Sequence, residues 1–219
     1  MLSLPHVTLC CIYNVAERLH WLAASECMRR AVFGGIKVFA RGDYERFVHY
    51  EMPKQIRTSH ILLIQWDSWI LNPSAWREEF LSYDYIGAPW WYNDEYNVGN
   101  SGFCLISKRL MEFLASHEKE FPVGRPYDDV LCRQYQRRLP QFKWAPEALA
   151  WRFSFERTTI YPLNEVFGFH GSFNFPIVLS PEALAERLSL GDAEPHIASK
   201  IEWKDLSWRI RVQKEIAYA

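Results

Sequence analysis

Two apolar runs separated by a helical pattern constrain the fold of this chain more than any other feature. Residues 6–13 (HVTLCCIY) and 60–65 (HILLIQ) have the length of strands and lack strict alternation, which indicates strands buried on both faces. Between them, apolar residues recur at helical spacing from Leu19 to Ala31, and a short strand-like run covers 36–40. Strands that alternate with helices form parallel sheets covered by helices on both faces. We therefore expect an α/β protein with a mostly parallel central sheet.

Capping residues and helix breakers predict where the other elements begin and end. Asn14, followed by Glu17 three residues later, resembles a capping box, and Gly34-Gly35 is expected to end that helix. Ser180-Pro181 places a cap and a proline where a helix begins. The remaining expected elements are helices that start near Asn72-Pro73, cover 107–121, follow Tyr127 and cover 201–219, and a short strand over 142–145.

Composition and charge exclude several classes of function. The chain has 219 residues, of which 49% are hydrophobic, so one domain with a substantial core is the default. Its 25 basic and 26 acidic residues are interleaved and give a net charge of -1, which argues against binding to nucleic acid. No run of about 18 apolar residues encodes a membrane span. Contact with a membrane surface and the oligomeric state stay open.

Targeting and redox signals predict a cytoplasmic protein. The residues after Met1 lack the basic segment and the cleavable apolar run of a signal peptide. The five cysteines are odd in number, have no C-x-x-C spacing and lie mostly in apolar runs. We therefore expect reduced, structural thiols.

Asp67 and His170 are candidate metal ligands. Asp67 comes just after 60–65, near the end of a strand where open parallel sheets place ligand-binding groups, although a turn aspartate is the alternative. His170 lies between Gly168 and Gly171, which indicates an imidazole held close to the backbone, although a lone histidine is more often structural. Together they suit Mn²⁺ or Mg²⁺, with substrate oxygens as further ligands.

A pair of carboxylates, Asp128 and Asp129, stands at the start of an expected helix. The helix dipole favours acidic residues at this position, so both can be purely structural. Alternatively, one of them is a general base, which transfer to a hydroxyl group requires. Asp129 is the first choice for this role and Asp128 the second.

A turn of small residues and the aromatic residues around it are candidates for substrate binding. Gly99, Asn100, Ser101 and Gly102 allow a polar ligand to approach the backbone closely, or they form an ordinary tight turn. Aromatic residues make up 16% of the chain, and several, including Trp90, lie near this turn in the sequence. Their rings can stack on a sugar or belong to the core.

Six segments follow one another in a recognisable order. They are QWDSWIL (65–71), YDYIGAPW (83–90), VGNSGFCLISKRLM (98–111), YDDVLC (127–132), APEALAWRFSFE (145–156) and FGFHG (167–171). Taken together, they resemble a bacterial family of GT-A-like glycosyltransferases first catalogued as a domain of unknown function, and the resemblance covers about residues 6–173. We therefore expect a GT-A-like catalytic domain over 1–175 and a helical extension over 176–219 packed on it.

The resemblance implies roles for the candidate residues. In GT-A enzymes an Asp-x-Asp motif and often a late histidine bind a divalent metal and the donor diphosphate, and Asp67 and His170 match the second aspartate and the histidine. Gln65 occupies the first acidic position and departs from that pattern. In inverting members an acidic residue at the head of a helix is the general base, which Asp129 or Asp128 matches.

The resemblance also implies the substrates. The donor is a nucleotide-diphosphate sugar, and the acceptor is a glycan or glycoconjugate of the kind found in bacterial surface glycan synthesis. The donor contacts are expected from strand-end residues, namely Tyr13, Asn14, Arg41, Asp43 and Gln65. The implied reaction is a single displacement with inversion at the anomeric carbon.

Two other classes of function stay open. A sugar nucleotidyltransferase uses a similar sheet and metal, but it normally has a glycine-rich basic loop after the first strand, which residues 11–20 lack. A noncatalytic carbohydrate-binding domain is favoured by the ten tryptophans and by the incomplete Asp-x-Asp motif.

Overall fold

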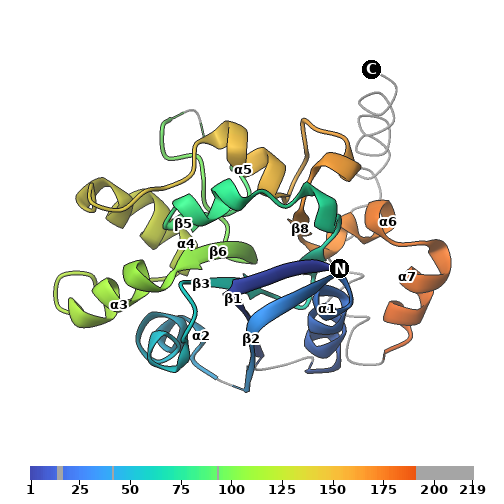
Figure 1. Ribbon diagram of the computed structural model, residues 1–219, viewed down its shortest axis with the longest axis horizontal. Helices are drawn as coiled ribbons and strands as arrows, with labels where there is room; N and C mark the ends of the chain where they lie inside the picture. The colour runs from blue at the N-terminus through green and yellow to red at the C-terminus, as the bar shows by residue number, and fades with distance from the viewer. Residues whose placement is uncertain (14–16, 41, 93, 191–219) are drawn as a thin grey trace.

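A five-stranded sheet forms the centre of the computed structural model, which describes residues 1–13, 17–40, 42–92 and 94–190 (Figure 1). The strand order is β2-β1-β3-β6-β5. The bounds are β1 (Leu2–Tyr13), β2 (Ala31–Ala40), β3 (His60–Ile64), β5 (Tyr85–Ile86) and β6 (Phe103–Ser107). The protein is thus a mixed α/β protein built on a central sheet.

The direction of β6 corrects the expectation of a mostly parallel sheet. β1 runs parallel to β2 and β3, whereas β6 is antiparallel to both β3 and β5. The described residues between β5 and β6 contain no helix, and only parallel neighbours require such a crossover. The sheet is therefore mixed.

Helices lie on both sides of this sheet, with α1 and α7 on the right and α2 and α3 on the left in Figure 1. The α-helices are α1 (Glu17–Arg30), α2 (Tyr44–Arg46), α3 (Lys108–Ser116), α4 (Tyr127–Asp129), α5 (Glu147–Phe153), α6 (Phe175–Val178) and α7 (Pro181–Leu188). π-Helical turns extend α2 over Phe47–Glu51 and α4 over Val130–Tyr135. Short 3-10 turns cover Pro53–Gln55, Pro73–Ala75, Glu78–Ser82, Gln136–Arg138, Leu163–Glu165 and Ser172–Asn174.

Alternating side chains of the central strands build a core on each face of the sheet. Leu9 of β1 and Leu62 of β3 belong to a core shared with α1 and α5. Their neighbours Cys10 and Leu63 belong to a second core, shared with α3. All four side chains are fully buried, as expected for strands covered on both faces. The five cysteines are free and buried in these cores.

Local signals predicted the start of α7 correctly and failed at two other positions. The Ser180 side chain accepts a hydrogen bond from the backbone of Ala183 and caps α7, as the sequence predicts. The expected helix end at Gly34-Gly35 is wrong, because both residues lie within β2. The expected strand over 142–145 is also absent, since Trp144 makes only an isolated bridge to a residue of β5.

A small second sheet joins segments that are far apart in the sequence. Its strand order is β4-β8-β7, with β4 (Ser68–Ile70), β7 (Ser154–Phe155) and β8 (Gly168–His170). β8 is antiparallel to β4 and parallel to β7. Because β4 follows β3 after three residues, this sheet brings the late strands to the C-terminal end of β3.

The described part of the expected C-terminal extension contains α7, which packs on α1. Arg187 of α7 is buried, lies 4.4 Å from the centre of the Trp69 ring and approaches Glu26 of α1 at 3.7 Å. The expected helix over 201–219 lies outside the described residues. A division of the chain at residue 175 remains a prediction.

Candidate functional site

Asp67 and His170 lie side by side because β4 pairs with β8. Asp67 directly precedes β4, and Ser68 is the register partner of His170. Asp67 Oδ1 and His170 Nε2 are 3.5 Å apart, and the side chains are only 3% and 15% exposed. Gly171 has a φ of 100°, a conformation that glycine adopts without strain, and the next N–H, that of Ser172, donates to Asp67 Oδ2 at 3.1 Å. The structure therefore brings both candidate ligands to one place.

Glu156 lies on the opposite edge of the imidazole ring. It follows β7, and its Oε1 atom is 3.4 Å from His170 Nδ1. Burial alone would lower the pKa of His170, but the charges and hydrogen bonds of Asp67 and Glu156 outweigh burial and raise it to about 10. Burial would likewise raise the pKa of Glu156, but its interaction with His170 lowers it. His170 is therefore an imidazolium held between two carboxylates at neutral pH.

The turn at 99–102 packs against the imidazole. Asn100 has a φ of 63°, its side-chain nitrogen lies 3.1 Å from His170 Nδ1, and its Oδ1 accepts the N–H of Gly102 at 3.1 Å. A Cβ atom on Gly102 would lie 2.1 Å from His170 Cδ2, so only glycine allows this approach. The Ser68 hydroxyl donates to the Gly102 carbonyl at 2.6 Å and joins the turn to β4.

The two carboxylates of α4 have different surroundings. Asp128 Oδ2 accepts the backbone N–H of Ser101, and Asp128 Oδ1 accepts that of Asp129, each at 3.0 Å. Asp129 is 39% exposed and forms a long ion pair with Arg133, at 3.9 Å. Asp128 therefore anchors the turn to α4, whereas Asp129 keeps its carboxylate open to solvent.

These groups line one pocket of about 670 Å³. Five of its lining residues are expected site residues, namely Trp90, Asn100, Asp128, Asp129 and His170. The others are Trp91, Tyr92, Pro126, Glu156 and Arg157. Carboxylates, basic groups and exposed rings thus face one cavity of a volume typical of small-molecule sites.

Three aromatic residues form a rim of this pocket. Trp90 lies on Gly99, where a Cβ atom would be 1.9 Å from the indole ring. Trp91 and Tyr92 are 63% and 48% exposed, and the guanidinium of Arg133 lies 3.6 Å from the centre of the Tyr92 ring. A rim with exposed and partly fixed aromatic faces can bind the apolar face of a sugar.

None of the described residues expected to contact a nucleotide, Asp67 included, is among those that line the pocket. Tyr13 ends β1, and its hydroxyl donates to a glutamate of α1 at 3.1 Å. Asp43 caps α2 and pairs with Arg125 at 3.3 Å. Asn14 and Arg41 lie outside the described residues. The expected nucleotide contacts therefore remain predictions.

The backbone of Gln65 is hydrogen-bonded to the turn at 99–102. Its backbone N–H donates to the Gly102 carbonyl at 3.0 Å and to the Ser68 hydroxyl at 2.9 Å. Gln65 itself is not among the residues that line the pocket. The residue at the first position of the expected metal motif thus contributes here through its backbone.

Glu156 and Arg157 line the pocket, although sequence reasoning did not select them as site residues. Glu156 ends the segment 145–156, which carries part of the family resemblance, and this membership is the signal in the sequence that could have identified it as a site residue. Arg157 follows it outside any motif. The preceding strand, β7, has two residues, which is too short for a periodic pattern to show where its end lies.

Two protein donors at this site suit a divalent cation, namely Asp67 Oδ1 and His170 Nε2. Within the described residues, no group of three or more His, Cys, Asp or Glu side chains could hold a metal ion. A cation bound by this pair would need its other ligands from a substrate, and its binding would require His170 to release a proton. Glu156 beside Nδ1 is the kind of partner that metal-bound histidines commonly have.

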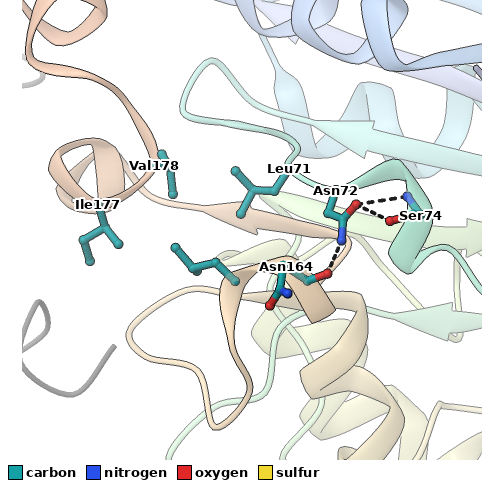
Figure 2. A pocket seen from close by; sticks show the side chains of 7 residues that line it. Leu71, Asn72, Ser74, Asn164, Ile177 and Val178 are labelled. Carbon is teal, nitrogen blue, oxygen red and sulfur yellow. Dashed lines mark hydrogen bonds between the residues drawn. The ribbon is translucent and has the colours of Figure 1, made fainter. Parts of the chain in front are cut away.

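A second cavity, of about 500 Å³, lies beside β4 and α6 and contains none of the expected site residues. Figure 2 shows its apolar side chains, including Leu71 and Val178, next to the amide of Asn72. That amide donates to the Asn164 carbonyl and accepts hydrogen bonds from Ser74. The polar atoms of the Asn72 side chain thus have hydrogen-bond partners within the protein.

Comparisons with known proteins support the fold and name one family. The model of a family described as "Protein of unknown function (DUF5672)" matches residues 41–170. No curated protein matches the chain. None of the helices in the described residues is long and apolar enough to cross a membrane.

Two solved structures are similar to the chain. The crystal structure of a glycosyltransferase involved in the glycosylation of the major capsid of PBCV-1 has a TM-score of 0.51 at 13% identity, over 88% of this chain and 98% of that one. This similarity indicates a shared fold. The crystal structure of A197 from STIV covers 60% of this chain and 78% of that one at 10% identity, and its TM-score of 0.36 supports no conclusion.

Proposed function

The chain belongs to the family described as "Protein of unknown function (DUF5672)", and from the geometry of its pocket we propose that it is a glycosyltransferase of the GT-A type. It moves a sugar from a nucleotide diphosphate to a hydroxyl group of a glycan or glycoconjugate. One observation carries the proposal. A solvent-open carboxylate, the histidine of a buried Asp–His pair and an aromatic rim line a single cavity near the C-terminal end of β3.

The position of the site supports this assignment. Open α/β sheets bind ligands at the carboxyl ends of their strands, and Asp67 lies there, three residues after β3 ends. The shared fold with a glycosyltransferase raises the prior for this chemistry, although fold alone does not establish function.

Asp129 is the proposed general base. The acceptor oxygen attacks the anomeric carbon while its proton passes to the Asp129 carboxylate, and the bond from that carbon to the diphosphate oxygen breaks. Attack from the face opposite the leaving group inverts the configuration. Asp128 is less suited to this role, because its two oxygens already accept backbone hydrogen bonds from Ser101 and Asp129.

Asp67 and His170 are the proposed protein ligands of Mn²⁺ or Mg²⁺. When bound, such a cation neutralises negative charge on the departing diphosphate. Because the described residues offer only two ligand atoms here, we expect the protein to bind the cation well only together with the diphosphate. Glu156 and Asn100 hold the imidazole so that Nε2 faces Asp67.

The aromatic rim is the proposed acceptor site. Trp91 and Tyr92 are the exposed members of the rim, and Asp129 lines the same cavity. An acceptor ring stacked there would lie on the side of the pocket that carries the base. The rim therefore supports a carbohydrate acceptor over an apolar one.

A panel of nucleoside-diphosphate sugars tests the proposal. The purified protein is screened by thermal shift with and without Mn²⁺, since a ligand that binds only the folded state raises its melting temperature. Donors that stabilise the protein are then tested for hydrolysis and for transfer to glycans. Stabilisation by one donor with Mn²⁺ and slow hydrolysis of it are expected. If no donor binds or turns over while free glycans stabilise the protein, the chain is a carbohydrate-binding domain instead.

A further inference from the structure

Arg157 is a basic residue of the pocket that makes no ion pair within the described residues. It follows Glu156 after β7, and its side chain is exposed and lines the cavity. Its guanidinium lies 5.8 Å from the centre of the Phe173 ring. In the part of the chain that the structure describes, Arg157 forms no ion pair within 4 Å.

Other arginines near the site are already paired. Arg133 binds Asp94 at 2.7 Å, and Arg125 contacts Asp43 at 3.3 Å. Arg152, five positions before Arg157, binds Glu165 at 2.9 Å. These guanidinium groups have carboxylate partners, whereas that of Arg157 has none within 4 Å among the described residues and can bind a ligand.

The carboxylates of the pocket show why an anionic ligand would need the Arg157 guanidinium. Asp128, Asp129 and Glu156 place three carboxylates on its lining, and His170 is engaged by Asp67 and Glu156. A diphosphate entering this cavity meets a surface that repels it unless positive charge is supplied. Guanidinium groups bind phosphate oxygens through two parallel hydrogen bonds, which gives both charge and orientation.

We propose that Arg157 binds the diphosphate of the nucleotide donor, on the wall of the pocket that also holds Glu156 and His170. This inference rests on the proposed function and assigns each substrate to its own part of the pocket. The leaving diphosphate lies toward Arg157 and His170, and the acceptor lies toward Asp129 and the aromatic rim. This arrangement assigns the two substrates to different lining residues of one pocket, and a displacement with inversion requires them to approach the anomeric carbon from opposite faces.

Binding measurements on variants of the full chain test this assignment without relying on turnover. Titration calorimetry compares the nucleoside diphosphate of the donor found in the screen with the matching monophosphate, and also inorganic pyrophosphate, each with Mn²⁺ present. The variants are Arg157→Gln and Arg157→Lys. The matched control is Arg152→Gln, which removes an arginine paired outside the pocket. Circular dichroism checks that each variant is folded.

We expect Arg157→Gln to lose about 10- to 100-fold in affinity for the diphosphate, the range for removing a hydrogen bond to a charged group. The affinity for the monophosphate should change much less, Arg157→Lys should recover part of the loss, and Arg152→Gln should bind like wild type. Pyrophosphate should follow the diphosphate.

Three outcomes would overturn the assignment. Equal losses for the diphosphate and the monophosphate would place Arg157 at the nucleoside. Unchanged diphosphate affinity together with a raised KM for the acceptor would place it at the acceptor, with the glycosyltransferase function intact. If the wild-type protein binds no nucleoside diphosphate at all, the proposed function fails and the role of Arg157 fails with it.

Discussion

Replacing Asp129 by asparagine should abolish most transfer and leave the fold and the donor site intact. The amide has nearly the same shape but cannot accept the acceptor proton, and general bases typically contribute about 10²- to 10⁴-fold to rate. The donor affinity should stay within about 3-fold, because a base acts on the reaction step and not on ground-state binding.

The structure also predicts the effect on stability, by comparison with Asp128→Asn. Asp129 makes one long ion pair with Arg133, 3.9 Å across one helical turn, and such exposed pairs contribute about 0.3–0.5 kcal/mol. Asp128 accepts two backbone hydrogen bonds, and an asparagine there faces one of these donors with its own NH₂ group, which costs roughly 1–3 kcal/mol. For a chain of this size, 1 kcal/mol lowers the melting temperature by about 2–4 °C.

The two variants should therefore show opposite profiles. Initial rates with a donor and a glycan acceptor give kcat, calorimetry gives the donor Kd, and a thermal melt gives the stability. Asp129→Asn should lose rate and melt within about 2 °C of wild type, while Asp128→Asn should melt about 2–12 °C lower and keep more of its rate. If Asp128→Asn loses the rate without loss of stability and Asp129→Asn remains active, the assignment of the base is reversed.

Three further changes probe the rest of the site and the fold. Gly102→Ala adds a methyl group that would lie 2.1 Å from His170 Cδ2, so the imidazole must move. Mn²⁺-dependent donor binding, measured by calorimetry, should therefore fall by at least about 10-fold. His170→Ala should weaken Mn²⁺ binding in the presence of the diphosphate by about 10- to 100-fold, and an unchanged response to Mn²⁺ in the folded variant would mean that His170 is not a ligand. Asp84→Asn concerns stability alone. Burial would raise the pKa of Asp84, but the hydrogen bonds and charge of the Arg109 guanidinium, together with hydrogen bonds from Ser107 and the Lys143 backbone, lower it from its ordinary 3.8. A depressed carboxyl pKa contributes stability above the unfolded-state value that is lost as the pH falls through the folded value. In urea melts at neutral pH, the free energy of unfolding of wild type should thus exceed that of Asp84→Asn by about 1.5–3 kcal/mol, and the difference should shrink below about pH 4. A difference independent of pH would refute this account.

Hydrophobic periodicity predicted the central strands, because burial on both faces leaves a local mark in the sequence. The apolar run 6–13 falls within β1, and the run 60–65 covers β3 and the residue after it; the side chains of both strands fill a core on each face. Caps carry information of the same local kind, as Ser180 shows at α7. These signals depend only on neighbours in the chain.

Gly34-Gly35 shows where such local signals fail. Two glycines normally end a helix, but here they lie within β2, paired with β1. A Cβ atom on Gly34 would lie 2.0 Å from the Pro5 carbonyl oxygen, so glycine is needed for the close approach of two strands. The reason for this residue is thus a contact between strands, which the local sequence does not display.

The resemblance to a known family identified Asp67 and His170 as related residues, while the contacts around them came from the tertiary structure. Neither position has a spacing that predicts the other. Their atoms meet at 3.5 Å because β4 and β8 pair across a long stretch of chain. Glu156 joins them because β7 lies parallel to β8, a pairing of two residues that no period reveals.

The sequence by itself determined the α/β class, the main buried strands, the absence of a strong charge suited to nucleic acid, and a short set of polar residues capable of chemistry. Only the tertiary structure decided the mixed direction of the sheet, the different surroundings of Asp128 and Asp129, and the place of Arg157 on the lining of the pocket. The physical reason is the range of the interactions. Periodicity and capping act over a few residues, whereas ion pairs, strand pairing and the walls of a pocket depend on which distant segments the fold brings together.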